Sequence, residues 1–133
     1  MKQRTRFLAA VMWWAAAGPV LAHESAHHAV AATPPAAQEQ LLTGEVVDTS
    51  CYLSHGAEGL GRGHASCAKK CIESGLPVAI RTGNQLYLAT MADHTPANKL
   101  LAKFAGQQVT VHGTILEQDG QRLVVISKVE KAN

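Results

Sequence analysis

Alternation of apolar and polar residues predicts a chain built mainly from β-strands. The stretch TGEVVDTSCY, residues 43–52, predicts a first strand that leads into a region rich in cysteine and glycine. The stretches LPVAIRT and QLYLATM flank Gly83-Asn84, a two-residue turn signal. They therefore predict a hairpin formed by the second and third strands.

A second hairpin is predicted near the C-terminus, where QQVTVHGTILEQ and QRLVVISKVEK flank Asp119-Gly120. Side chains alternate between the two faces of a strand, so every second residue of the first of these strands should face the core. The expected inward set is Val109, Val111, Gly113 and Ile115.

Two segments follow a helical pattern instead. HASCAKKCIES, residues 64–74, predicts a helix that ends at Gly75 in the left-handed conformation, because Pro77 prevents its continuation. A shorter helix is expected after the third strand, with Thr95 as its N-cap and Gly106 as its C-terminal cap.

Five strands with a helix between the third and the fourth are the order of the OB-fold, a small Greek-key barrel. We therefore predict a mainly β fold: a five-stranded OB-fold-like barrel over residues 43–133, with a Cys/His-containing helical insertion at 51–75 after the first strand. Ligands of this fold commonly sit beside the loops after the first and fourth strands, and the insertion occupies the first of these loops.

The N-terminus is typical of an export signal. Three basic residues precede the apolar run FLAAVMWWAAAGPVLA, and small residues before His23 suit cleavage after residue 22. We expect residues 1–22 to be a signal peptide, residues 23–42 to be a flexible tail containing His23, His27 and His28, and the protein to be periplasmic. The free amine and imidazole of His23 could add a copper ligand.

Charge and composition exclude some classes of partner. The chain has 12 Lys and Arg against 10 Asp and Glu, and its excess of bases lies in the signal segment. A near-neutral domain with few aromatic rings lacks the features of a nucleic-acid binder. The apolar run is short for a membrane helix, so we expect no span in the mature chain. No nucleophile accompanies Asp93 and His94, so the sequence favours a binding module over an enzyme.

The candidate site combines three cysteines and a histidine. At about 100° per residue, His64, Cys67 and Cys71 share one narrow face of the predicted helix. Cys51, at the expected end of the first strand, can fold over through the glycine-rich loop to join them. His55 is a reserve donor.

Three thiolates and one imidazole form a Cys3His set that suits tetrahedral zinc, and soft sulfur ligands also suit Cu(I). The metal hypothesis is thus a module that holds zinc or copper through Cys51, His64, Cys67 and Cys71. Such a module would either handle the ion or use it as a structural staple.

Two alternatives remain open. A disulfide from Cys51 to Cys67 or Cys71 would staple the insertion to the barrel, leaving a protein-interaction module that binds another exported protein. Cys67 and Cys71 could instead exchange disulfides as a redox pair, because basic residues lie beside Cys67 near the helix N-terminus.

The motifs GEVVD..C, H..CA..CI..G.P and FAG..V.V.G, followed by a closing hairpin, cover most of residues 43–130. This pattern resembles a group of small exported bacterial proteins with an OB-like barrel. The resemblance implies the barrel and the four-ligand set Cys51, His64, Cys67 and Cys71, and it implies no particular activity.

Overall fold

A computed structural model describes residues 38–132, which contain five strands, three α-helices and two 3-10 helices. The strands are β1 (Glu39–Asp48), β2 (Val78–Thr82), β3 (Gln85–Met91), β4 (Gln108–Gln118) and β5 (Gln121–Lys131). The helices are α1 (Thr49–His55), η1 (Gly56–Gly59), α2 (Gly61–Glu73), α3 (Asn98–Leu101) and η2 (Ala102–Phe104).

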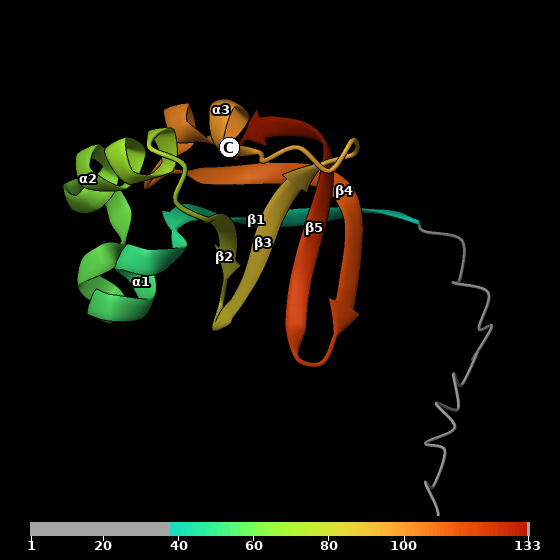
Figure 1. Ribbon diagram of the computed structural model, residues 1–133, viewed down its shortest axis with the longest axis horizontal. Helices are drawn as coiled ribbons and strands as arrows, with labels where there is room; N and C mark the ends of the chain where they lie inside the picture. Colours follow the sequence, from blue (N-terminus) through green and yellow to red (C-terminus); the bar gives the residue numbers. More distant parts are fainter. Residues whose placement is uncertain (1–37, 133) are drawn as a thin grey trace, which may run out of the picture. The chain divides into compact units, whose positions relative to one another are not determined.

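The strands close into one ring in the order β1-β2-β3-β5-β4, and β4 pairs with β1 to complete it (Figure 1). All neighbours are antiparallel except β3 and β5, which run parallel. Both hairpins predicted from the sequence are confirmed, with turns at Gly83-Asn84 and Asp119-Gly120. The mainly β prediction therefore holds for the described chain.

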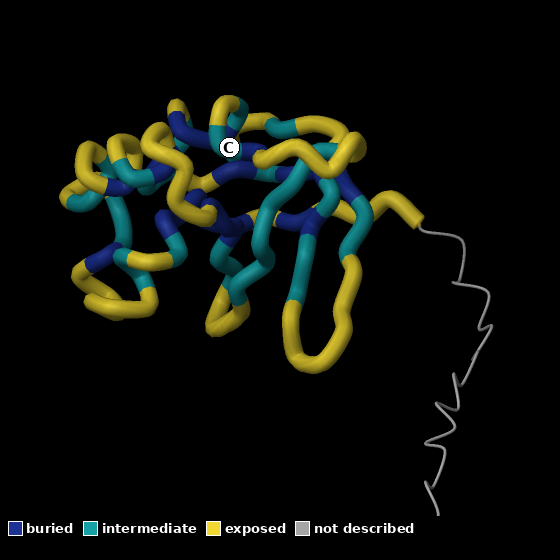
Figure 2. The backbone as a smooth tube through the Cα atoms, in the orientation of Figure 1, coloured by how far each residue is buried: buried dark blue, intermediate teal, exposed yellow. Residues whose placement is uncertain are grey.

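The core lies inside the ring and beneath the helices (Figure 2). Alternate residues of β4 point inward as expected: Val109 and Val111 are fully buried, and Gly113 is also buried. Ile115 is only half-buried, because β4 and β5 continue beyond the core as an exposed hairpin. The largest buried side chains are Ile72, Ile80, Leu101 and Ile126.

Strand β1 differs from its predicted bounds at both ends. It begins at Glu39, so the last residues of the expected tail pair with β4, from Glu39 opposite Thr114 onward. It ends at Asp48, and Cys51 lies in helix α1 rather than at the end of a strand. The Asp48 side chain causes this change, because it accepts a hydrogen bond from the Cys51 backbone N–H and thereby caps α1.

The predicted helix after β3 is shorter than expected. Its α-helical part, α3, begins at Asn98, and Thr95 is not its N-cap. Thr95 instead donates through its backbone N–H and its hydroxyl to Asp93, at 3.0 and 2.6 Å. These hydrogen bonds hold the pKa of the Asp93 carboxyl below its usual value. The Thr95 side chain therefore stabilises the turn at Asp93 instead of accepting a hydrogen bond from the first turn of the helix.

Helix α2 packs on the core along one face and is bound to β1 at its N-terminal end. Ala68 and Ile72 are buried in the core, at the i and i+4 positions of one helical face. The buried Glu45 of β1 accepts a hydrogen bond of 2.5 Å from the backbone N–H of Gly61, the first residue of α2. A carboxylate is favourable at this end of a helix, where N–H groups lack partners.

Asn98 secures the other end of α2. Its side-chain amide donates to the carbonyls of Ile72 and Leu76, at 2.7 and 2.8 Å. We expect Asn98→Asp, which keeps the size but removes both donors, to lower the free energy of unfolding by about 2 kcal/mol, and Asn98→Ala to cost somewhat less. Urea unfolding measures both values. Equal stability of the wild type and the Asp variant would contradict this account.

Within residues 38–132, no helix is long and apolar enough to cross a membrane. The expected signal segment, residues 1–22, lies outside the described residues. The same is true of His23, His27 and His28, so these expectations stay predictions.

Candidate metal centre

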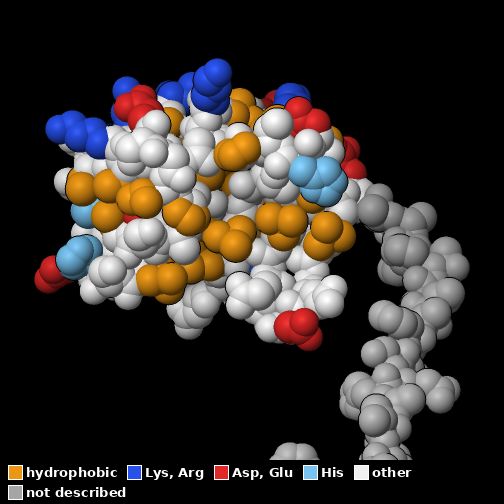
Figure 3. Space-filling model, viewed as in Figure 1, with side chains coloured by type: hydrophobic (Ala, Val, Ile, Leu, Met, Phe, Trp, Pro, Cys, Tyr) orange, Lys and Arg blue, Asp and Glu red, His pale blue; other side chains and the backbone are white. Residues whose placement is uncertain are grey.

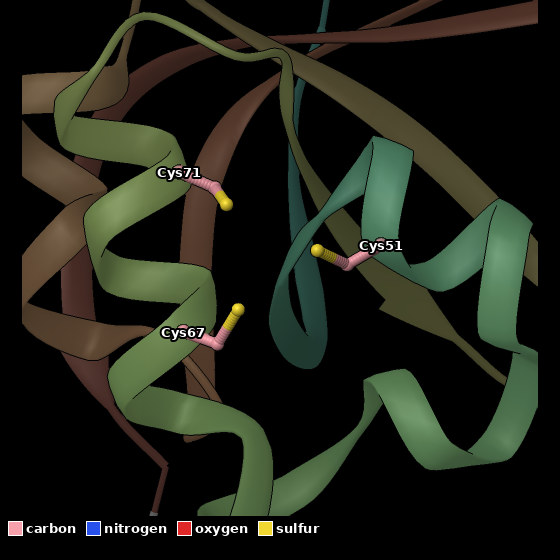
Figure 4. A group of neighbouring side chains, drawn as sticks. All are labelled: Cys51, Cys67 and Cys71. Atoms are coloured by element: carbon pink, nitrogen blue, oxygen red, sulfur yellow. The ribbon is translucent and has the colours of Figure 1, made fainter.

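The three cysteines of the chain meet between two helices. Cys67 and Cys71 project from α2 toward Cys51, which projects from α1 (Figure 4). Their three Sγ atoms lie within 4.8 Å of one another, and all three thiols are free. The fold thus brings together the three cysteines of the predicted ligand set, although Cys51 is distant from the other two in the sequence.

Local sequence explains why the thiols converge. Cys67 and Cys71 each precede a buried residue of α2, Ala68 or Ile72, so they lie about 100° around the helix from the face that packs on the core. That neighbouring face is turned toward α1. Cys51 is directed back across the gap by the Asp48 cap, which fixes the first turn of α1.

The histidines are placed differently. The group that could hold an ion contains only the three cysteines among residues 38–132, and neither His64 nor His55 belongs to it. Helix α2 begins at Gly61 and runs unbroken through His64, so His64 and Cys71 are about 10.5 Å apart along the axis at 1.5 Å per residue. His55 lies exposed at the end of α1. The proposal of His64 as a ligand stays a prediction from the sequence.

Burial controls the protonation of two thiols in the metal-free protein. Removal from water raises the pKa of the Cys51 thiol to about 12, and the nearby Asp48 carboxylate adds to the rise. Burial likewise raises the pKa of Cys71. Neither thiol is activated as a nucleophile, since that requires a lowered pKa. Their protons must leave before the sulfurs can bind a metal.

The sulfur arrangement fits a thiolate-bound ion. Zn–S bonds of about 2.3 Å place the sulfurs of a tetrahedral site roughly 3.8 Å apart. Sulfur atoms that already lie within 4.8 Å of one another need only a small contraction to reach this distance. Cys67 is exposed whereas Cys51 and Cys71 are half-buried, so an ion can enter from the Cys67 side.

One residue that positions a cysteine of this site was missed from the sequence. Asp48 is fully buried, one oxygen of its carboxylate holds Cys51, and the other has no hydrogen-bond partner among residues 38–132. A signal was present, since Asp followed by Thr and Ser is a common helix N-cap pattern. The β-like alternation of GEVVDTSCY obscured it.

Comparison with known proteins adds no relative: no family model, no curated protein and no solved structure matches the chain.

Proposed function

We propose that this is an exported metal-binding protein whose three cysteines hold one zinc or Cu(I) ion as thiolates. The observation that carries the proposal is the convergence of all three Sγ atoms within 4.8 Å, from two separate helices. Soft thiolate ligands are those that both ions accept. The exposure of Cys67 favours an ion that exchanges, and thus handling of the metal, over a closed structural site.

The free cysteines weigh against the two alternatives from the sequence. A structural disulfide would pair Cys51 with a cysteine of α2, whereas here all three thiols are free and lie within 4.8 Å of one another. Disulfide exchange between Cys67 and Cys71 would also need Cys71 to react as a thiolate, whereas burial raises the pKa of Cys71. A bound ion also accounts for the odd number of cysteines, which a disulfide does not.

We further infer that the ring is an OB-fold-like barrel carrying the site in the connection after its first strand. Support comes from the strand order β1-β2-β3-β5-β4 and from the helical segment between β3 and β4. Export to the periplasm is proposed from the signal-like residues 1–22.

Metal content and thiol accessibility test the function together. Full-length protein purified without oxygen should carry about one zinc or copper ion per chain, measured by mass spectrometry of the metals. Its three thiols should react slowly with a thiol reagent until a chelator is added, and then react fully. A metal-free chain with one fixed disulfide would overturn the proposal and support the stapled module.

A second candidate function is the binding of another exported protein. Apolar side chains gather on one face of the molecule (Figure 3). A hollow of about 490 Å³ lies between α1 and the two hairpin turns, and its rim includes Leu53, whose exposed fraction is 70%. A photocrosslinker at position 53 should capture an exported protein. A photocrosslinker at the distant, exposed position of Lys99 should not capture that protein. Equal capture at both positions would argue against the protein-binding function.

A further inference from the structure

The two hairpins of the ring separate before they reach their turns (Figure 1). Strand β3 pairs with β5 over only four residue pairs, from Leu88 opposite Leu123 onward. Nearer the turns, residues 85–87 of β3 and 121–122 of β5 pair, within the described chain, only with the other strand of their own hairpin. Two strand edges without a partner strand therefore face each other across a gap.

The register of each hairpin determines where the free backbone groups point. In an antiparallel ladder, pairs that exchange hydrogen bonds alternate with pairs that do not, and the pair flanking a two-residue turn exchanges them. Leu86, opposite Arg81, belongs to the second pair from its turn, so its N–H and C=O point away from β2 and into the gap. Arg122, opposite Glu117, is placed in the same way, so its N–H points into the gap from β5. The gap therefore offers two donors and one acceptor to an added strand.

Apolar side chains lie beside this gap. Leu86 and Leu88, two residues apart on β3, point to the same face of the strand and line the hollow of about 490 Å³ together with the exposed Leu53 of α1. A second hollow, of about 440 Å³, extends from Leu88 over Leu123 and Leu116. Both volumes are within the range of about 300–1,000 Å³ that is usual for binding sites. Because the two hollows share Leu88, they form one elongated apolar groove.

We propose that the gap between β3 and β5 binds an extended, apolar peptide segment of another exported protein, which adds a short strand between the two hairpins. This inference rests on the protein-binding function, the second candidate above. Because β3 and β5 run parallel to each other, one added strand can run antiparallel to both, which is the more stable arrangement. Backbone hydrogen bonds to Leu86 and Arg122 supply affinity, and the side chains of alternate residues supply specificity by contacting the groove.

The free backbone groups identify an extended chain as the occupant. An α-helix uses its own N–H and C=O groups internally, so it could cover the apolar side chains but would leave Leu86 and Arg122 without partners. An apolar small molecule would leave them without partners as well. The rim also disfavours a charged segment, because the Arg122 guanidinium is already paired with Glu117 at 3.1 Å. The preferred segment therefore alternates apolar and uncharged polar residues.

The test uses the full-length protein and a probe peptide of alternating threonine and leucine, with one lysine at each end for solubility. Amide hydrogen exchange, followed by NMR, should slow by about tenfold or more at Leu86 and Arg122 when the peptide is saturating, because both amides then donate to it. A second peptide carries N-methyl groups on alternate residues, which keeps the side chains but removes backbone donors. Its affinity should be lower by about tenfold or more. Equal affinity of the two peptides, or unchanged exchange of both amides at millimolar peptide, would overturn strand addition.

Two exposed leucines give a matched pair of variants. Leu53, which is 70% exposed, borders the groove, whereas Leu41, which is 66% exposed, lies on β1 and lines neither hollow. Because both side chains are exposed, aspartate at either position should leave the fold intact. Leu53→Asp should weaken binding of the first peptide by about tenfold or more, since it places a charge at an apolar contact, and Leu41→Asp should leave the affinity unchanged. Equal affinities of the two variants would contradict the inference.

The inference and the protein-binding function can fail separately. If a photocrosslinker at position 53 captures an exported protein and excess peptide reduces the capture, strand addition is supported. If excess peptide leaves the capture unchanged, the protein-binding function stands and strand addition is wrong. Capture of only a second copy of this chain would overturn the assignment of the occupant to a partner protein. Absence of both capture and peptide binding would defeat both proposals.

Discussion

Cys51→Ser is expected to lower the affinity for zinc by about 100- to 1000-fold. Structural zinc sites of four ligands bind with roughly 10–16 kcal/mol, so one ligand contributes about 2.5–4 kcal/mol, and every 1.4 kcal/mol is a factor of ten. Serine keeps the size of the side chain and replaces the soft thiolate by a hydroxyl, which is a poor ligand for zinc and worse for Cu(I).

Cys51 is also the only thiol supplied by α1, so its loss has a second consequence. The proposed ion would link α1 to α2 in the wild type, and excess zinc should then raise the melting temperature because it binds only the folded chain. In Cys51→Ser this rise should be largely lost.

Ser50→Ala alters an exposed neighbour on the same helix and is the matched control, with affinity and zinc-dependent melting like the wild type. Competition titration and thermal melting with and without zinc measure both effects. If Cys51→Ser kept the wild-type zinc affinity, Cys51 would not be a ligand. The ion would then be held by Cys67 and Cys71 of α2 and by a donor other than the third cysteine.

The pattern of the sequence was sufficient for the two hairpins because their information is local. Gly83-Asn84 and Asp119-Gly120 determine their turns by backbone preference, and the alternation along β4 determines which face is buried. The closure of the ring is a different matter. The parallel pairing of β3 with β5 joins Leu88 to Leu123, and no local signal specifies such a partner.

The positions of the site residues could be predicted where they share one helix, α2. The positions of residues that approach the site from other elements could not. Helical spacing was enough to place Cys67 and Cys71 on one face. The same spacing suggested His64, but an unbroken helix separates it from Cys71 along the axis. Asp48 could not be recognised as a neighbour of the thiols, because that depends on how α1 turns back after β1.

A large loss of stability from a single methyl group is expected at Gly44. A Cβ there would lie 2.4 Å from the Arg81 carbonyl oxygen and 2.9 Å from Ile80 Cγ2, both in β2. Gly44 lies just before β1 changes from pairing with β4 alone to pairing with β2. A methyl group can be accommodated only by separating two strands of the closed ring. We expect Gly44→Ala to lower the free energy of unfolding by about 3 kcal/mol or more.

Gly63→Ala is the matched control, because the same methyl group enters open space there. Gly63 is exposed within α2, has no atom within 4 Å of the added Cβ, and has no left-handed φ. Alanine should therefore stabilise the protein by about 0.5–1 kcal/mol through the lower entropy of its unfolded chain. Urea unfolding of the two variants should thus give changes of opposite sign. A mild or stabilising effect of Gly44→Ala would show that β1 and β2 separate easily at this point, and hence that the ring does not depend on their close approach.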